Sequence, residues 1–300
     1  MQVSDNSRGI AAMLVAMAGF IFNDAMVKLV SESLPLGQIM MVRGGISVVL
    51  LTCLCYVTGV FANLPVLKHR AVGWRMLGEM SATVLYLSAL FQLPIANATA
   101  ILQALPLVVT AAAAMFFRDP VGWRRWTAIL VGFLGVLLIV RPGLSGFNAW
   151  SFVALGGVFF MAVRDLATRQ LPKETPTLGV ALLTMIGVSL LGGAMVLVHG
   201  WEPMNLKQLA YLFVASVFII IGYIFIIAAM RTGEIVVVAP FRYSIVLWAI
   251  LLGYLFWDEV PDLMTLLGTG VVVLTGVYTF MRERKLLAGI PRHSTPGAEK

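Results

Sequence analysis

Six ionisable side chains lie inside apolar stretches long enough to cross a bilayer, where a charge is costly and often functional. Arg242 illustrates the problem, because it lies about two turns inside the almost entirely apolar or aromatic stretch from Ile235 to Trp257. Such an arginine either pairs with a carboxylate on a neighbouring helix or faces a watery cavity and binds a substrate. The six residues are Asp24, Arg43, Glu79, Arg164, Asp165 and Arg242.

Depth along each stretch suggests how these charges could pair. At about 1.5 Å of rise per residue, Glu79 and Arg242 both lie roughly 10–14 Å from the same end of their stretches. Asp24 and Arg43 share a level near the opposite end. Each pair could therefore be a structural ion pair or part of a cavity. Arg164 and Asp165 lie near the end of their stretch, where snorkelling to the interface accounts for them.

Uncharged polar and aromatic residues extend the candidate cavity. Glu79 and Tyr86 are seven residues apart and share one helix face. Tyr243 and Trp248 either line the cavity or pack between helices. The substrate-binding candidates are Glu79, Tyr86, Gln103, Tyr223, Arg242, Tyr243 and Trp248, and the candidates for an intramembrane ion pair are Asp24 and Arg43.

The elements that must position these side chains are transmembrane helices. The chain of 300 residues is 60% hydrophobic and only 12% charged, with a mean hydropathy of +0.95, whereas soluble domains are about 45–50% apolar. Stretches of about 17–25 apolar residues predict an all-α protein with ten transmembrane helices. Their expected ranges are 9–30, 37–60, 71–92, 96–117, 124–141, 149–168, 177–199, 207–230, 235–257 and 262–281.

Basic residues predict how these helices are oriented. The net charge of +7 does not indicate nucleic-acid binding, because the lysines and arginines gather in short segments between apolar stretches. Alternate segments hold Arg8, Lys68, Arg124, Lys173, Arg231 and Arg284, among others, whereas the remaining segments hold only Lys28, Arg141 and Lys207. The positive-inside rule therefore predicts that both termini are cytoplasmic.

An internal repeat organises the chain into two halves. A shift of about 141 residues places Asp24 on Asp165 and Lys28 on Arg169, and, with a slip of one residue, 116–119 on 256–259. Five helices per half make the second half cross the membrane in the opposite sense, as in inverted-repeat transporters whose substrate site lies between the halves. We expect repeats at 1–144 and 145–282 around a central cavity, followed by a polar, disordered cytoplasmic tail at 283–300.

Enzyme and cofactor signatures are missing from the sequence. It contains no HExxH, GxSxG or P-loop pattern. Its two cysteines, Cys53 and Cys55, lie in one apolar stretch, and its histidines do not cluster. We therefore expect no enzymatic activity, no cofactor, no metal site and no ATP-driven pumping by this chain alone.

Several motifs resemble those of one family. They are Leu105-Pro106, Phe117-Arg118-Asp119-Pro120-Val121 and Arg141-Pro142-Gly143 in the first half, and Ala239-Pro240-Phe241-Arg242-Tyr243 and Asp258-Glu259-Val260-Pro261 in the second. Over about residues 8–282 the chain resembles ten-helix proteins of the drug/metabolite transporter superfamily with two EamA domains, and within it the YddG-type amino-acid and metabolite exporters. Arg118-Asp119 departs from the Gly-Glu that is usual in that family.

The resemblance implies a secondary transporter in the bacterial inner membrane. We expect it to export amino acids or related small polar metabolites by alternating access, with membrane lipid and the substrate as its partners. Uptake or exchange of a nucleotide-like or sugar metabolite is the alternative within transport. A receptor or assembly subunit that does not transport is the alternative from another class. The sequence does not set the oligomeric state, and a monomer is compatible with it.

Overall fold

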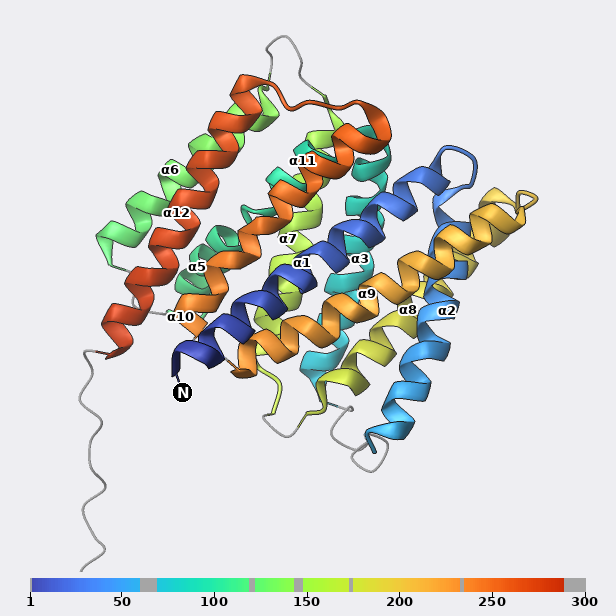
Figure 1. The fold of residues 1–300 in the computed structure, drawn as a ribbon, viewed down its shortest axis with the longest axis horizontal. Coiled ribbons are helices and arrows are strands. Elements are labelled where there is room, and N and C mark those ends of the chain that lie inside the picture. The colour runs from blue at the N-terminus through green and yellow to red at the C-terminus, as the bar shows by residue number, and fades with distance from the viewer. Residues whose placement is uncertain are drawn as a thin grey trace, which may run out of the picture.

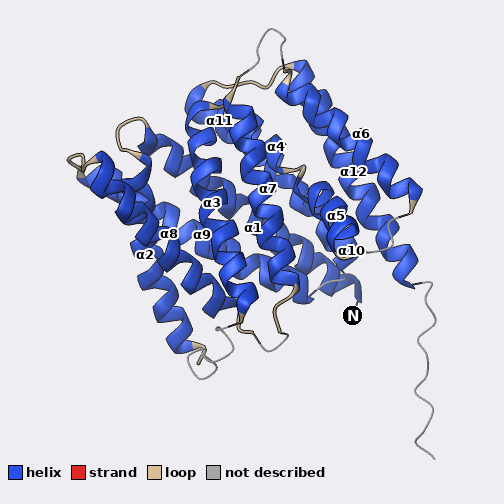
Figure 2. Ribbon diagram, turned by 180° about the vertical axis from the view of Figure 1, so that it is seen from behind, coloured by secondary structure: helices blue, strands red, loops and turns tan. Residues whose placement is uncertain are grey.

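A computed structural model describes residues 2–59, 69–118, 122–142, 148–172, 175–232 and 235–288, and every regular element in these ranges is helical (Figure 2). This confirms the predicted all-α class. The first half contains α1 (Gln2–Ser31), α2 (Leu36–Val57), α3 (Arg70–Gln92), α4 (Ile95–Leu102), α5 (Leu105–Phe116) and α6 (Trp123–Val140). The second half contains α7 (Trp150–Arg169), α8 (Thr177–His199), α9 (Leu206–Thr232), α10 (Ile235–Val238), the 3-10 helix η2 (Ala239–Tyr243), α11 (Ser244–Trp257) and α12 (Leu263–Ala288).

Each predicted span coincides with one helix or with short helices in series. Nine segments of the described chain are long and apolar enough to cross a membrane. The tenth, α3, has sufficient length but carries Arg70, Arg75 and Glu79. The last helix runs to Ala288, so the expected tail begins later than predicted, and 289–300 lie outside the described residues.

Two of the predicted spans are broken instead of continuous. The span at 96–117 divides into α4 and α5 at Gln103-Ala104, and the span at 235–257 divides into α10, η2 and α11. A proline follows each break, Pro106 in α5 and Pro240 in η2. Proline lacks an N–H, so the carbonyl four residues earlier loses its helical partner. The two breaks fall in corresponding spans of the two halves, a feature of secondary-transporter sites.

Helix pairing follows the repeat. The most extensive contacts join α1 to α9, α3 to α7, α2 to α8 and α6 to α12, and Figure 1 shows α1 beside α9 and α6 beside α12. If the halves correspond in chain order, α1 matches α7, α2 matches α8, α3 matches α9 and α6 matches α12. Exchanging the halves then turns the α1–α9 pair into the α7–α3 pair and leaves the α2–α8 and α6–α12 pairs unchanged. These contacts are therefore the ones that two-fold symmetry between the halves requires.

Close helix approach depends on small residues at the crossings. A Cβ built on Gly78 of α3 would lie 2.8 Å from the backbone N of Arg164 in α7. One built on Gly268 of α12 would lie 2.6 Å from the carbonyl O of Gly135 in α6. Small residues at such crossings let helices associate in lipid, where burial of apolar surface gives little driving force.

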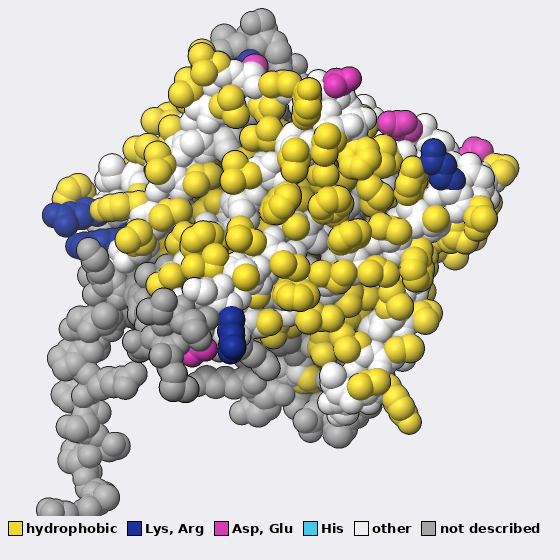
Figure 3. Space-filling model, in the orientation of Figure 1, with side chains coloured by type: hydrophobic (Ala, Val, Ile, Leu, Met, Phe, Trp, Pro, Cys, Tyr) yellow, Lys and Arg dark blue, Asp and Glu magenta, His cyan; other side chains and the backbone are white. Residues whose placement is uncertain are grey.

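The outer surface is apolar, as a lipid-facing protein requires. On the face seen in Figure 3, hydrophobic side chains cover most of the described surface and the charged ones lie mainly towards its edge. Large exposed side chains include Leu134 of α6, Leu247 of α11 and Leu274 of α12. The charged residues inside the spans therefore have to be accommodated between helices.

The helix termini define two opposite ends of the molecule. The end where α1 finishes at Ser31 and α4 begins is called the Lys28 end. The opposite end, where α7 finishes, is called the Arg169 end. The first turns of α1 and the last turns of α12 lie at this same lower edge in Figure 1.

Candidate functional site

A first polar group joins α1, α2 and α3. Tyr86 Oη donates to Asp24 Oδ2 at 2.7 Å, and Asn23 Nδ2 donates to Asp24 Oδ1 at 2.9 Å. Arg43 Nη1 donates to Asn23 Oδ1 at 2.9 Å. Asp24 and Arg43 thus belong to one network, but Asn23 bridges them, and the direct ion pair considered from the sequence is absent from the described contacts.

Arg43 retains unused donors. Its side chain is almost fully buried, and Nη1 is the only guanidinium nitrogen with a hydrogen-bond partner among the described residues. A guanidinium has five N–H donors in a planar fork that matches a carboxylate. Arg43 contacts Asn23 and not the Asp24 carboxylate, so its guanidinium fork can bind a further anionic group.

A second polar group joins α3 to α7. Arg164 Nη1 lies 3.0 Å from Glu79 Oε2, and Arg164 Nε lies 2.8 Å from Asp165 Oδ1. Of the two alternatives that the sequence left open for Glu79, an ion pair with Arg242 is therefore not the pair that forms, and the snorkelling expected for Arg164 is wrong. The reason is helix adjacency: α3 packs on α7, where Gly78 lets the backbones approach closely beside Arg164.

Tyr223 of α9 connects the two polar groups. It lies within electrostatic reach of Arg43, Arg75, Glu79 and Arg164, and Arg43 is likewise within reach of Glu79. The Tyr223 hydroxyl has no hydrogen-bond partner among the described residues. One interior region, formed by α1, α2, α3, α7 and α9, therefore collects both signs of charge and an unused hydroxyl.

The other candidates lie near the helix breaks. Arg242 is exposed, and with Tyr243 it lines an apolar pocket of about 190 Å³ between α1, α5, α9, η2 and α12. Pro106 and Pro240 line the same pocket. Gln103 is buried at the first break, and Trp248 of α11 packs against core residues. The predicted residues therefore separate into a polar interior with Glu79, Tyr86 and Tyr223 and an apolar pocket with Arg242 and Tyr243.

Sequence reasoning missed Asn23, Lys28 and Glu259. Lys28 Nζ donates to the carbonyl O of Leu93 at 2.6 Å and to Glu259 Oε1 at 3.1 Å. Glu259 Oε2 accepts the N–H of Ile95 at 3.0 Å. Lys28 belongs to the repeat alignment and Glu259 to a family motif, but neither pattern indicates that the two side chains meet.

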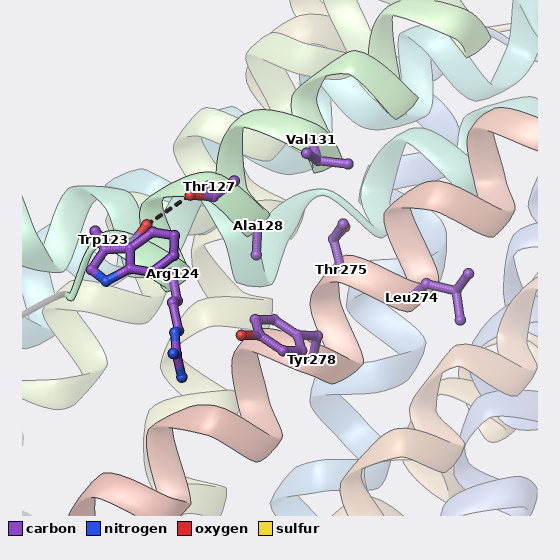
Figure 4. Close-up of a pocket in the computed structure, with 8 residues that line it drawn as sticks. All are labelled: Trp123, Arg124, Thr127, Ala128, Val131, Leu274, Thr275 and Tyr278. Atoms are coloured by element: carbon purple, nitrogen blue, oxygen red, sulfur yellow. Dashed lines mark hydrogen bonds between the residues drawn. The ribbon is translucent and has the colours of Figure 1, made fainter.

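A larger pocket lies at the perimeter, between α6 and α12 (Figure 4). It measures about 400 Å³, and Tyr278 of α12 points its hydroxyl towards Trp123 and Arg124 of α6. None of the predicted site residues lines it. No group of three or more potential metal-ligating side chains occurs in the part of the chain that the structure describes.

Comparison with known proteins identifies the family. The EamA-like transporter family matches residues 7–141 and again residues 148–281. The chain belongs to this family. It is thus a transporter of the drug/metabolite transporter superfamily and not an enzyme, and its two matched segments correspond to the two expected repeats.

Relatives of known function handle small metabolites. The chain is 28% identical over 284 residues to the pseudopaline exporter CntI of Pseudomonas aeruginosa, covering 91% of this chain and 96% of that protein. It is 27% identical over 286 residues to a riboflavin transporter of Vibrio cholerae, covering 93% and 94%. An S-adenosylmethionine uptake transporter of Rickettsia conorii is 23% identical over 65% of this chain and 66% of its own length.

One solved crystal structure shares the fold. It superposes with a TM-score of 0.63 over 96% of this chain and 99% of that chain, at 15% sequence identity. The fold and the family together establish a multi-pass membrane transporter of small molecules. Which substrate it moves depends on the residues of this chain.

Proposed function

We propose that this protein is a secondary transporter that exports small zwitterionic metabolites, amino acids or their close derivatives, across the bacterial inner membrane. The observation that carries the proposal is the interior region where Arg43, Asp24 and Glu79 lie among apolar helices. A zwitterion needs a cationic and an anionic partner close together. Charges inside spans usually mark a substrate pathway.

Each polar residue has a role in this proposal. The unused donors of Arg43 bind the substrate carboxylate, and Asp24, held by Asn23 and Tyr86, accepts from the ammonium group. Tyr223 supplies a hydroxyl and an aromatic wall. Glu79 is neutralised by Arg164 and positions α3 against α7. A site with few polar groups and apolar walls suits a fixed backbone with a variable side chain.

Alternating access follows from two inverted five-helix halves. The symmetric pairing of α1 with α9 and of α3 with α7 supports a two-fold relation between the halves, and an odd number of spans in each half would make that relation an inversion. Rocking one half against the other would expose the polar interior to each side in turn. The distribution of lysine and arginine supports cytoplasmic termini, and hence a multi-pass inner-membrane protein with both ends inside.

A second candidate function rests on the Arg242 pocket. The pocket is apolar apart from one exposed cation, so it suits a flat or elongated ligand with an anionic end. Relatives that transport riboflavin and S-adenosylmethionine favour a nucleotide-like substrate for such a pocket, by uptake or exchange.

Counterflow into proteoliposomes separates these functions. Vesicles preloaded with unlabelled amino acids, nucleosides, flavins or sugars are given the labelled compound outside, and accumulation is followed. We expect saturable counterflow with amino acids. Counterflow of nucleosides or flavins alone would overturn the amino-acid assignment, and binding without counterflow of any class would overturn transport.

Two arginines provide a matched pair of variants for the site. Lysine keeps the charge but loses the planar fork, so Arg43→Lys should raise the concentration for half-maximal counterflow at least about tenfold, a loss of about 1.4 kcal/mol of binding. Arg242→Lys should leave it within about twofold. The reverse result would place the substrate in the Arg242 pocket.

A further inference from the structure

A cluster of contacts closes the Lys28 end of the molecule. Lys28 lies at 7% exposure, although it is a lysine near the end of a helix. Its ammonium group contacts the Leu93 carbonyl and Glu259, and it lies 4.9 Å from the centroid of the Trp257 ring. A lysine this buried needs such compensation, because its charge is removed from water.

These contacts join the two halves of the repeat. Lys28 belongs to α1 and Ile95 to the first turn of α4, both in the first half. Trp257 ends α11, and Glu259 follows it in the second half. Glu259 holds Lys28 with one carboxylate oxygen and the first turn of α4 with the other. Separating the halves at this end would therefore break both bonds of Glu259, whereas the bond from Lys28 to the Leu93 carbonyl lies within the first half and would remain.

The opposite end carries the counterpart of this cluster. The shift of 141 residues maps Lys28 onto Arg169, and the aligned segments 116–119 and 256–259 bring Phe117 opposite Trp257. The structure places the Arg169 guanidinium 5.5 Å from the centroid of the Phe117 ring. The residues after the two rings also match, since Arg118 and Asp258 both adopt positive φ, 55° and 51°. Both ends thus use a cation over an aromatic ring before a left-handed residue.

The two ends differ in exposure. Lys28 is buried, whereas Arg169 is exposed and Phe117 is 39% exposed. A pocket of about 750 Å³ opens at the Arg169 end between α3, α5 and α7, and Phe117 lines it. Side-chain exposure in the second polar group also increases towards this end, from 12% for Glu79 to 21% for Arg164 and 35% for Asp165.

We propose that Lys28 with Trp257 and Glu259, and Arg169 with Phe117, form two pseudo-symmetric latches that close in alternation. The structure is the state in which the Lys28 latch is closed and the Arg169 end is open. In the other state, Arg169 and Phe117 would become buried as Lys28 is here, and the bonds of Glu259 would open. The proposal builds on the proposed transport function, and it assigns the gating to named residues.

The test measures which end is open, without substrate. In a protein with Cys53→Ser and Cys55→Ser, two single-cysteine reporters are labelled with a water-soluble maleimide in detergent. Thr99→Cys reports on the Lys28 end, because Thr99 is fully buried in α4 beside Tyr86. Ala167→Cys reports on the Arg169 end, because Ala167 lines the pocket there.

Latch variants should move the two reporters in opposite directions. Glu259→Gln keeps an acceptor for the Ile95 N–H but loses the charge that holds Lys28. The ratio of labelling at Thr99→Cys to labelling at Ala167→Cys should therefore rise about tenfold. Arg169→Gln should lower this ratio. Glu202→Gln is the matched control, because Glu202 is an exposed carboxylate at the same end that bonds to Gln38 through its backbone, and it should leave the ratio unchanged.

The outcomes separate the latch from the transport function. Faster labelling of both reporters in Glu259→Gln would mean general loosening and would overturn the latch, as would an unchanged ratio. A ratio that shifts as expected in a protein with no counterflow would support the latch and overturn the proposed transport. Counterflow in a protein whose ratio never shifts would support transport and overturn the latch.

Discussion

The crossing of α6 and α12 provides a quantitative test of the fold, because two glycines of α12 differ sharply in their surroundings. A Cβ at Gly268 would lie 2.6 Å from the carbonyl O of Gly135, whereas one at Gly270, two residues later in the same helix, would meet nothing within 4 Å. Alanine at the two positions therefore makes the same chemical change with opposite structural consequences.

The magnitude follows from these distances. An ordinary Cβ contact begins at 3.4 Å, so Gly268→Ala must move the backbones about 0.8 Å further apart, from 2.6 to 3.4 Å. Forcing an extra group into a packed contact costs about 1–3 kcal/mol. Gly270→Ala should instead stabilise by about 0.5–1 kcal/mol, because alanine loses less backbone entropy in a helix. Gly268→Ala shares this entropic gain, so the two variants should differ by the packing cost alone, about 1–3 kcal/mol.

Heating in detergent measures the difference. Each variant carries a fluorescent fusion, and the fraction that elutes as folded protein on size-exclusion chromatography is followed with temperature. At about 2–4 °C per kcal/mol, the midpoint of Gly268→Ala should be about 2–12 °C below that of Gly270→Ala. Gly135→Ala should behave like Gly268→Ala, because its Cβ would lie 2.9 Å from the Gly268 carbonyl O. Equal midpoints for Gly268→Ala and Gly270→Ala would refute the close crossing.

Three further predictions concern the polar residues. Because Glu79 is bound by the Arg164 guanidinium of α7, Glu79→Gln should lower the melting midpoint and leave the response of counterflow to a pH gradient unchanged. Loss of this pH response at unchanged stability would instead make Glu79 a proton carrier. Tyr86→Phe removes one hydrogen bond to the Asp24 carboxylate, worth about 1.5–3 kcal/mol, and should weaken both substrate affinity and stability. The control Tyr56→Phe, at an exposed site, should change neither. Equal effects of the two substitutions would contradict the network of Asp24, Asn23 and Tyr86. Hydrogen bonds from Arg141 lower the pKa of Asp262 in the loop before α12 to about 2. A depressed pKa stabilises the fold above about pH 4, and this stabilisation disappears as the pH falls towards 2. Because Asp262 is largely exposed, the stability of wild type should exceed that of Asp262→Asn by less than about 1 kcal/mol at pH 7 and by nothing near pH 2. A stability difference that grows on acidification would refute this sign.

The helices were predictable because the length of an apolar stretch reports directly on a membrane span. Every expected range corresponds to observed helix, even for α3, whose interior charges take it below the usual composition of a span. The breaks at Gln103 and in 239–243 were missed, since Pro106 and Pro240 lie within apolar runs whose composition does not change. A proline can sit in the first turn of a new helix or kink a continuous one, and hydropathy does not distinguish the two.

The pairing of the charges inside the spans was not predictable from the sequence. Depth along a helix places Glu79 and Arg242 at one level, but it says nothing about which helices are neighbours. The choice of Arg164 as the partner of Glu79 depends on α3 packing against α7. A two-fold relation between the halves is consistent with this pairing, since α1 then relates to α9 as α7 relates to α3, but the contact has to be known once before symmetry can supply it again.

Symmetry of the scaffold does not extend to the charges, and this difference bears on transport. Under the shift of 141 residues, Asn23 corresponds to Arg164 and Arg43 to Thr184. Arg43 bonds within the first half, to Asn23, whereas Thr184 accepts from Arg75 across the halves at 2.7 Å. A two-fold scaffold presents equivalent surfaces to both sides of a membrane, so a symmetric charge pattern would accept a zwitterion equally well in either orientation. In the proposed site, the guanidinium donors of Arg43 that have no partner among the described residues would give the carboxylate of a zwitterion one preferred partner in both states, so the substrate would keep one orientation while the halves rock around it.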